Sequence, residues 1–416
     1  MMAVGGLLST SLVHVADSRN SLFILSYYPA VTPAQQHLSL PLPSADALEL
    51  SGRLQALINR EIQAAGGWIS FARYMELALY APGLGYYSAG SRKLGAAGDF
   101  TTAPELSPLF ARTLARQVAE LISTGLTDIV ELGAGSGALA AVLLDELAAL
   151  DALPRNYLIL EVSADLRERQ QAHLTATVPQ LAHGVQWLDR LPEHLNAIVI
   201  GNEVLDALPV HRIRVQQGGI EEIGVAVNNN GYVWESRPAA AALIARAQAL
   251  ALPDDYETEI AMAAPALLVD LAHRLDRGAL LFVDYGFPAH EFFHPQRDRG
   301  TLMCHYRHHA HADPFLWPGL QDITAHVDFS AIAHAGAKLD LLGYTGQAQF
   351  LINCGITDLI SAVPAADTRH YAPLAAQAQK LLSPAEMGEL FKVIALGRGI
   401  TAPLSGFRSG DRAHTL

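Results

Sequence analysis

The feature that constrains the fold most is a glycine-rich segment between a short apolar strand and a helix. Residues 128–132, Asp-Ile-Val-Glu-Leu, are typical of a buried strand, and residues 138–150 follow with the apolar pattern of a helix. Between them the chain reads Gly133-Ala-Gly135-Ser-Gly137. Glycine at alternate positions allows a tight turn and lets a ligand lie directly against the backbone. The segment therefore predicts a ligand-binding turn at the carboxyl end of a strand.

The same alternation of strands and helices continues towards the C-terminus. Further apolar runs are typical of strands, and a helix is expected between the first two of them, from Ala164 to Leu174. The expected strands are Tyr157–Glu161, Val185–Leu188, Ala197–Ile200, Leu280–Asp284, Lys338–Tyr344 and Phe391–Leu396. Apolar strands that alternate with helices predict a mostly parallel sheet covered on both faces. We therefore expect an α/β fold.

Changes in pattern divide the chain into four segments. We expect a poorly ordered leader, an N-terminal helical segment, an α/β core with two insertions, and a loose tail. These segments are residues 1–43, 44–125, 126–400 with insertions at about 210–237 and 288–335, and 401–416. In the second segment, Thr102–Glu105 is typical of a capping box that opens a helix running to about Ser123. In the first insertion, Asn228–Gly231 predicts the turn of a β-ribbon.

Composition narrows the classes of function. The chain has 28 Lys and Arg against 41 Asp and Glu, a net charge of −13, which argues against a nucleic-acid-binding protein with its basic surface. Two cysteines form neither a disulfide framework nor a CxxC motif, and no apolar run is long enough to span a membrane. No Lys or Arg precedes Arg19, so an export signal is not expected. We expect a bacterial cytoplasmic protein.

Acidic residues accompany the glycine-rich turn. Glu131 immediately precedes the glycines, and Glu161 closes the next strand. The spacing is G-x-G-x-G rather than the G-x-G-x-x-G of dinucleotide enzymes, and an acid at Glu131 suits a ligand ammonium better than a pyrophosphate. A carboxylate at Glu161 can accept both hydroxyls of a ribose. Together they indicate S-adenosylmethionine, which carries no phosphate. Asp189, after the third strand, is either a contact for its adenine or a solvated turn residue.

A second group of polar residues follows the fourth strand. Asn202-Glu203-x-x-Asp206 lies at the edge where open α/β sheets bind ligands, and Asp284 and Tyr285 follow a later strand to the same edge. Carboxylates can grip a planar guanidinium with paired hydrogen bonds, so Glu203 and Asp206 are candidates for positioning an acceptor. The structural alternative is that these acids open a helix, where they favour its dipole.

The chain also resembles the MidA-type family of class I S-adenosylmethionine-dependent methyltransferases. The resemblance extends from about Trp68 to Gly397 and rests on blocks that occur in the same order. These blocks are Ala72–Met75, Gly85–Tyr87, Gly98–Glu105, Glu131–Gly137, Leu160–Ser163, Asn202–Val210, Val283–Gly286 and Gln321–Phe329. The resemblance implies a class I sheet, mostly parallel with an antiparallel C-terminal strand, and S-adenosyl-L-methionine as the cofactor.

The resemblance further implies roles for single residues. Asp99, Thr101 and Thr102 are expected in a lid over the cofactor, with helix capping as the alternative for this segment. Asn202, Glu203 and Asp206 fall at the acceptor site of the family. His326 is expected either to take a proton from the acceptor or to be a hydrogen-bonded, half-buried histidine. The mitochondrial relative is described as a protein arginine methyltransferase needed for assembly of respiratory complex I, so a basic protein acceptor is expected.

Two other functions are open on the sequence. One is an NAD(P)-linked oxidoreductase on a similar architecture, against which the glycine spacing and Glu131 argue. The other is a catalytically idle assembly factor that uses the fold as a docking surface. A metal site is not expected in the histidine-rich stretch His305–His311, because its spacing matches no zinc motif.

Overall fold

The computed structural model describes residues 40–89 and 102–416, which belong to one compact unit. Nearly all of the expected leader lies outside the described residues, as do Asp99 and Thr101 of the expected lid. None of the helices in the described ranges is long and apolar enough to cross a bilayer.

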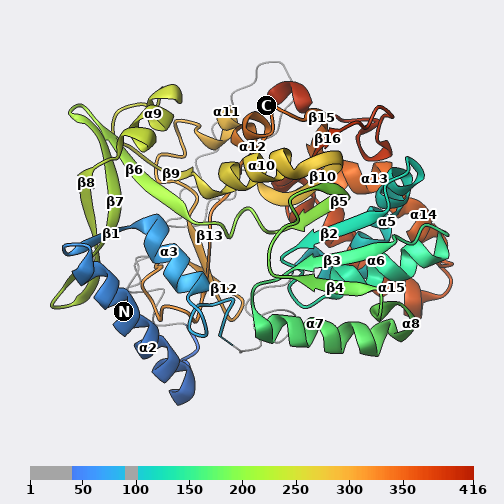
Figure 1. Ribbon diagram of the computed structural model, residues 1–416, viewed down its shortest axis with the longest axis horizontal. Helices are drawn as coiled ribbons and strands as arrows, with labels where there is room; N and C mark the ends of the chain where they lie inside the picture. Colours follow the sequence, from blue (N-terminus) through green and yellow to red (C-terminus); the bar gives the residue numbers. More distant parts are fainter. Residues whose placement is uncertain (1–39, 90–101) are drawn as a thin grey trace, which may run out of the picture. The chain divides into compact units, whose positions relative to one another are not determined.

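The core is an eight-stranded sheet (Figure 1). Seven strands lie in the order β15-β16-β10-β5-β2-β3-β4, and β14 pairs with β10 outside this path. Their bounds are β2 Asp128–Leu132, β3 Asn156–Leu160, β4 Val185–Leu188, β5 Leu195–Asn202, β10 Leu275–Phe287, β14 Val327–Asp328, β15 Asp340–Gly346 and β16 Phe391–Arg398. Only the pairs made by β16 are antiparallel. The expected α/β sheet with an antiparallel C-terminal strand is confirmed.

Helices cover both faces of this sheet because its strands are apolar on both sides. Ile198 and Ile200 belong to the apolar cluster on one face, whereas Val199 between them belongs to the cluster on the other, as the two-residue period of a strand requires. The first cluster includes residues of α5 Pro108–Ser123, α6 Ala138–Ala149, α7 Ala164–Thr177, α13 Gln347–Asn353, α14 Ile356–Ser361 and α15 Thr368–Leu382. The second includes residues of α10 Ala263–Arg274 and α12 Phe329–Ala335.

The order of the strands determines where a ligand can bind. The chain moves outward from β2 through β3 to β4 and then returns to β5 on the other side of β2. The connections after β2 and β5 therefore diverge, which leaves a crevice at the carboxyl ends of these two strands. The glycine-rich loop follows β2 and the Asn202–Asp206 segment follows β5, so both predicted sites lie at this crevice.

An antiparallel sheet is inserted between β5 and β10. Its path is β1-β7-β6-β9, with β8 paired to β7, and Asn228 pairs with Gly231 across the predicted turn. The bounds are β1 Trp68–Ser70, β6 Val210–Gln216, β7 Gly219–Asn228, β8 Gly231–Pro238 and β9 Tyr256–Ala261, with α9 Ala241–Ala249 before β9. The inserted sheet thus extends beyond residue 237 to Ala261, and it recruits β1, a strand too short for the sequence pattern to reveal.

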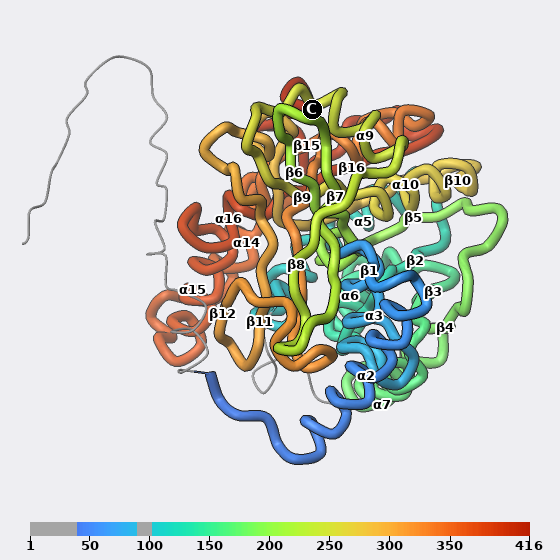
Figure 2. The backbone as a smooth tube through the Cα atoms, turned by 90° about the vertical axis from the view of Figure 1, so that its left-hand side faces the viewer, coloured from blue at the N-terminus to red at the C-terminus, as the bar shows by residue number. Residues whose placement is uncertain are grey.

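The N-terminal helical segment packs on this inserted sheet. Leu54 of α2 (Ala45–Ala64) and Phe71 of α3 (Phe71–Tyr80) share an apolar cluster with Val225 of β7 and Ile323. Figure 2 shows the inserted sheet from the front, with α2 and α3 on one side of it and β11 and β12 on the other. The second insertion forms a three-stranded sheet, ordered β12 His309–His311, β11 Met303–Tyr306 and β13 Asp322–Thr324. The remaining α-helices of the described residues are short, namely α4 Ala103–Leu106, α8 Pro179–Ala182, α11 Ala289–Phe292 and α16 Met387–Leu390, and two 3₁₀ turns lie at Ser405–Phe407 and Ala413–Thr415.

The helix expected from Thr102 to Ser123 is broken in two. Thr102 precedes α4 and its side chain makes no capping hydrogen bond, so the capping box is wrong. Ser107 adopts an extended conformation between α4 and α5, because a residue before proline is disfavoured in the helical region and Pro108 follows. Its hydroxyl accepts a hydrogen bond from the Leu109 N–H (3.2 Å) and caps α5 instead.

The C-terminal residues, expected to be loose, are packed. Leu404 and Phe407 are buried, and the Phe407 ring lies 5.5 Å from the ring of Phe350. The Arg412 N–H donates to the Tyr344 carbonyl of β15 (2.6 Å), so the tail also binds the edge strand of the main sheet. Two apolar residues among Gly, Ser and charged neighbours give a weak sequence pattern, yet each fills a pre-formed apolar site.

We expect Phe407→Ala to lower the free energy of unfolding by about 3 kcal/mol, because it removes a buried ring and leaves a cavity against Phe350. Urea unfolding followed by circular dichroism measures the change. The neighbouring variant Arg408→Ala removes an exposed side chain and should change stability by less than about 0.5 kcal/mol. Equal stability of the two variants would show that the tail is loose after all.

Candidate active site

The glycine-rich loop after β2 has a backbone that only glycine adopts easily. Gly133, Gly135 and Gly137 have φ values of +60°, +55° and +84°. A Cβ on Gly133 would lie 3.4 Å from Cγ2 of Val204, and one on Gly137 would lie 3.4 Å from Cα of Gln170. Side chains here would be strained and crowded, so the loop presents bare peptide to the crevice.

Two carboxylates flank this loop at the ends of neighbouring strands. Glu131 in β2 is 2% exposed and accepts a hydrogen bond from the Tyr157 hydroxyl (2.6 Å), while burial raises the pKa of its carboxyl to about 7. Glu161 follows β3, and burial also raises the pKa of this carboxyl. Glu131 pairs with Ile159 across the two strands, two residues before Glu161, so both predicted cofactor acids lie near the carboxyl ends of β2 and β3.

Gln170 of α7 connects the second acid to the loop. Its Nε2 donates to the Gly135 carbonyl (3.0 Å) and to Glu161 Oε2 (3.2 Å), and its Oε1 accepts from the Trp187 indole N–H (2.8 Å). Sequence reasoning missed Gln170, because α7 is polar along most of its length and only Gln170 and Leu174 are buried in it. Its hydrogen bonds fix the orientation of Glu161 relative to the glycines.

Asp189, the residue after β4, lies at the same edge of the sheet. Its carboxylate lies 2.7 Å from NH2 of Arg167, a residue of α7 that also donates to the carbonyls of Glu161 and Leu188. Arg167 therefore ties together the ends of β3 and β4. The Asp189 side chain is 89% exposed, so it is available to a ligand, and its contact with adenine stays a prediction.

These residues suit a ligand that has a cationic amino-acid end and a diol. Bare peptide between two acids accommodates both groups, whereas a pyrophosphate would meet two carboxylates at the position where it needs N–H donors. The donor set thus fits S-adenosylmethionine: Glu131 would hold the ammonium end, Glu161 the ribose, and the glycine-rich loop the chain between them.

The loop after β5 forms the second half of the crevice. Glu203 has φ +52°, a left-handed conformation that is uncommon for a residue with a side chain, and its N–H donates to the Val283 carbonyl of β10 (2.9 Å). Glu203 Oε1 accepts from Asn202 Nδ2 (3.2 Å) and from the Ala103 N–H at the start of α4 (3.4 Å). The segment of the expected lid that is described, from Thr102 onward, therefore contacts this loop. We call residues 202–207 the acceptor loop.

Strand β10 holds the acceptor loop in place. Asp284 Oδ2 accepts hydrogen bonds from the N–H groups of Val204 (3.1 Å), Leu205 (2.8 Å) and Asp206 (3.4 Å). The next residue, Tyr285, donates its hydroxyl proton to Asp206 Oδ2. Both residues lie at the edge that the sequence predicted, and Asp284 acts on the backbone of the loop rather than on a ligand.

The acceptor loop holds two acidic side chains, of which Asp206 is buried and Glu203 is half-buried. Burial, increased by repulsion from Asp206, raises the pKa of Glu203 to about 8, and burial raises the pKa of Asp206 to about 6. Oδ1 of Asn202 and Oδ1 of Asp206 are buried without a hydrogen-bond partner. In residues 40–89 and 102–416, no Lys, Arg or His forms an ion pair with Glu203 or Asp206. The loop is therefore preset for a cation that donates several hydrogen bonds.

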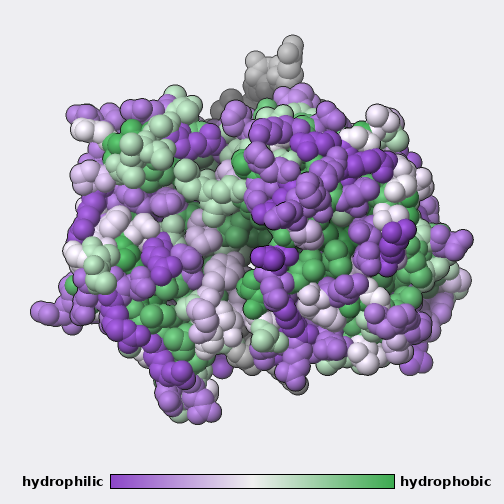
Figure 3. Space-filling model, in the orientation of Figure 1, coloured by the Kyte–Doolittle hydropathy of each residue, from purple (hydrophilic) through white to green (hydrophobic). Residues whose placement is uncertain are grey.

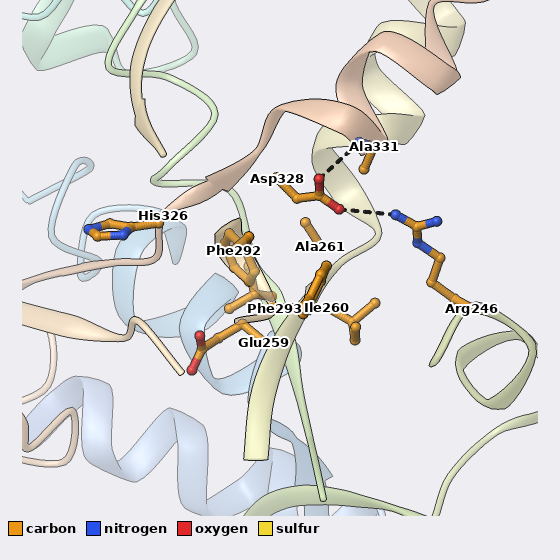
Figure 4. A pocket seen from close by; sticks show the side chains of 10 residues that line it. Arg246, Glu259, Ile260, Ala261, Phe292, Phe293, His326, Asp328 and Ala331 are labelled. Atoms are coloured by element: carbon orange, nitrogen blue, oxygen red, sulfur yellow. Dashed lines mark hydrogen bonds and ion pairs between the residues drawn. The ribbon is translucent and has the colours of Figure 1, made fainter. Parts of the chain in front are cut away.

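His326 lies behind Tyr285. Its ring meets the Tyr285 ring edge-on at 5.3 Å, and its backbone N–H donates to Oγ1 of Thr301 (3.0 Å). It lines a cavity whose other walls include Glu259 and the Arg246–Asp328 ion pair (Figure 4). Burial lowers the pKa of His326 to about 3, which makes the imidazole a weak base. Its link to Asp206 runs through Tyr285, and a role in proton transfer stays a prediction.

The crevice is open to solvent on one face of the molecule. Figure 3 shows a hollow between the elements of the main sheet and those around α3 and β13. Among the described residues, no cluster of three His, Cys, Asp or Glu side chains is arranged to hold a metal ion.

The chain matches proteins with a related function in sequence and in structure. A family model described as a putative S-adenosyl-L-methionine-dependent methyltransferase matches residues 109–345. The mitochondrial protein arginine methyltransferase NDUFAF7 of Danio rerio is 31% identical over 365 residues, which cover 79% of this chain and 83% of that protein. The Mus musculus protein of the same name is 30% identical over 364 residues, which cover 79% of this chain and 81% of that protein. The crystal structure of a likely methyl transferase from Burkholderia thailandensis bound to S-adenosyl-homocysteine superimposes with a TM-score of 0.88 at 53% identity, covering 91% of this chain and all of that one.

The pKa of Glu131 predicts how ligand binding depends on pH. A carboxyl with a pKa of about 7 is protonated at lower pH, and a ligand ammonium beside it favours the charged form. We therefore expect the affinity for S-adenosyl-homocysteine to rise about tenfold between about pH 6 and pH 8, with release of a proton on binding. Calorimetry in buffers of different ionisation enthalpy measures both quantities.

Glu131→Gln removes the titrating group and should make the affinity nearly independent of pH over this range. The matched control is Glu146→Gln at the far end of α6, where the carboxylate pairs with Arg112 (2.7 Å) and should leave the pH dependence intact. An affinity in the unmodified chain that does not change with pH would contradict the role of Glu131.

Geometry and comparisons lead to one assignment. The glycine-rich loop, the two acids beside it and the strand order of the sheet fit S-adenosylmethionine, and the similar structure holds S-adenosyl-homocysteine, the form of this cofactor after methyl transfer. The family model covers more than half of the chain, and the Danio rerio relative, at 31% identity, matches 79% of it. The chain belongs to the MidA-type family of class I S-adenosylmethionine-dependent methyltransferases.

Proposed function

We propose that this methyltransferase modifies the guanidinium group of an arginine in a protein. The observation that carries the proposal is the acceptor loop, where the carboxyl groups of the buried Asp206 and the half-buried Glu203 form no ion pair with a cation among the described residues. A guanidinium is planar, stays charged and donates five hydrogen bonds, so it can satisfy both carboxylates and the unpartnered Asn202 Oδ1 at once.

The two carboxylates have different tasks. Asp206 is fixed by the Tyr285 hydroxyl on one oxygen, so its other oxygen, Oδ1, is oriented to bind an N–H of the acceptor. Glu203 is fixed by two hydrogen bonds to Oε1, which leaves Oε2 to face the acceptor. The bound cofactor supplies the electrophilic methyl group. The positive charge of a bound guanidinium lowers the raised pKa of Glu203 and favours its ionised form, so we assign to Oε2 the proton that the guanidinium gives up on methylation.

The relatives support an arginine acceptor. The proteins of Danio rerio and Mus musculus that match this chain carry the name protein arginine methyltransferase. The net charge of −13 also favours a basic acceptor, because an acidic cleft raises the local concentration of cations. We take a subunit of respiratory complex I as the first acceptor protein to test, following the family resemblance. A reducing, cytoplasmic location is part of the same proposal, and it is supported by the two cysteines, which are both buried and free.

The alternatives differ in what they require of the site. A nicotinamide enzyme is not favoured, because the acids beside the glycine-rich loop and the family matches both indicate S-adenosylmethionine. An idle docking factor would keep the fold without needing unpaired carboxylates in the acceptor loop. Methyl transfer from labelled cofactor separates this alternative from an enzyme.

Mass spectrometry of proteins from cells with and without this chain tests the proposal. We expect methylarginine on at least one protein only when the chain is present. Purified protein should then transfer labelled methyl to the unmethylated acceptor, and Glu203→Gln should lower the rate about 100-fold while changing the affinity for S-adenosyl-homocysteine less than about twofold, since Glu203 acts on the acceptor.

The matched control is Glu193→Gln, an exposed residue before the amino end of β5, and it should transfer methyl at the unmodified rate. Methyl groups found only on other residue types would overturn the arginine assignment. A Glu203→Gln protein with full activity would overturn the assigned role of Glu203.

A further inference from the structure

The N-terminal helical segment places two stacked tyrosines beside the acceptor loop. Tyr80 is the last residue of α3, and Tyr87 lies on the turn that follows. Their ring centroids are 5.5 Å apart and their planes differ by 25°. The chain reverses between them, because the N–H groups of Tyr86 and Tyr87 donate to the carbonyls of Ala78 (2.9 Å) and Leu79 (2.8 Å). The last turn of α3 and the segment after it therefore run side by side.

This reversal requires glycine at position 85. A Cβ there would lie 2.5 Å from the backbone nitrogen of Ala81 and 2.7 Å from the carbonyl carbon of Leu79. The Gly85 N–H also donates to the Ala81 carbonyl (2.7 Å). The tight turn explains why a glycine precedes Tyr86 and Tyr87.

The hydroxyl groups of the two tyrosines connect them to the site. The Tyr80 hydroxyl donates to the Ala207 carbonyl in the acceptor loop (2.9 Å), and the Tyr87 hydroxyl donates to Asp322 Oδ1 of β13 (2.9 Å). The Ala325 N–H, just after β13, donates to the Asp206 carbonyl (3.1 Å). The tyrosines, β13 and the acceptor loop thus form one hydrogen-bonded assembly at the end of the main sheet.

The charges around the tyrosines are negative. Asp322 is 2% exposed, and its charge, like that of Asp206, contributes to the raised pKa of Glu203. Burial raises the pKa of the Tyr80 phenol, and the charges of Asp322, Asp206 and Glu161 raise it further, so the hydroxyl stays neutral. Tyr80 therefore lies in the field of acids from both the acceptor side and the cofactor side, where a cation is attracted to its ring.

We propose that the stacked Tyr80 and Tyr87 rings form an aromatic wall of the acceptor site that selects a planar guanidinium over a compact ammonium. A guanidinium stacks on an aromatic face and gives up its hydration more easily than an ammonium, which binds as a hydrated point charge. Both rings are only partly buried. Tyr87 is held between Tyr80 and the edge-on ring of Tyr86 (5.0 Å), so Tyr80 is the end of the described stack. This inference rests on the proposed function and names the residues that set its specificity.

The test compares two small cations on the protein loaded with S-adenosyl-homocysteine. Ethylguanidinium and ethylammonium are titrated separately, and binding is followed by ligand-observed NMR. We expect the unmodified chain to bind ethylguanidinium about fivefold more tightly. In Tyr80→Leu, which lacks the ring, the preference should fall below about twofold, whereas Tyr80→Phe keeps the ring and should keep the preference.

Control variants separate selectivity from folding. Asp322→Asn removes a charge without changing shape, so it should weaken both cations alike and leave their ratio unchanged. Tyr371→Leu, on α15, should change neither affinity. The affinity of each variant for S-adenosyl-homocysteine shows that the crevice is intact, and if Tyr80→Leu does not fold, Tyr87→Leu replaces it with the same expected loss of preference.

If Tyr80→Leu prefers ethylguanidinium over ethylammonium as strongly as the unmodified chain does, the proposed aromatic wall is overturned. Equal binding of both cations by the unmodified chain, or no binding of either, overturns it as well. The proposed function fails on a different result. Transfer of methyl to a residue other than arginine would refute the arginine acceptor. Arginine methylation together with an unchanged preference for ethylguanidinium in Tyr80→Leu would refute only the aromatic wall.

Discussion

The acceptor site depends on one buried carboxylate, that of Asp284. It accepts hydrogen bonds from three consecutive N–H groups of the acceptor loop, and each such bond contributes about 0.5–1.5 kcal/mol. This is enough to offset the left-handed conformation of Glu203, which costs of the order of 1–3 kcal/mol. Because Asp284 belongs to β10, the main sheet itself holds Glu203 and Asp206 at the crevice.

The two halves of the crevice come from different parts of the fold. The main sheet supplies the cofactor side, with Glu131, Glu161 and the glycine-rich loop at the ends of β2 and β3. The acceptor side is completed by the N-terminal segment and the insertions, which contribute Tyr80 and Asp322. A common methyltransferase sheet thus provides the reaction with its cofactor, and we propose that the added elements select the group that is methylated. The inserted sheet and α3 share one apolar cluster, so these added elements form a single support for the acceptor site.

Local patterns in the sequence were sufficient to predict the main sheet and the residues on its loops. The strands are continuous apolar runs, and the Glu131–Gly137 segment combines a strand end, glycine spacing and an acid within seven residues. Asn202, Glu203 and Asp206 follow from the same logic, because ligands bind at the carboxyl ends of parallel strands. Such residues can be recognised from their immediate neighbours in the sequence.

Other parts of the site depend on contacts between distant positions. Tyr80 meets Ala207 across 127 positions and Tyr87 meets Asp322 across 235, and neither tyrosine has a neighbour that signals this role. Gln170 is similar, since its function follows only from its position under the glycine-rich loop. The packed tail shows the same limit: the apolar site that receives Phe407 is formed by Phe350, which precedes it by more than fifty positions.

The most direct measurement is a crystal structure of the protein with S-adenosyl-homocysteine and a short arginine peptide. We expect a guanidinium whose nitrogens lie within about 2.7–3.2 Å of carboxylate oxygens of both Glu203 and Asp206, with one nitrogen directed at the sulfur of the cofactor product. A peptide bound with its arginine outside the acceptor loop, or an acceptor loop whose carboxylates are engaged by residues of the chain itself, would contradict it.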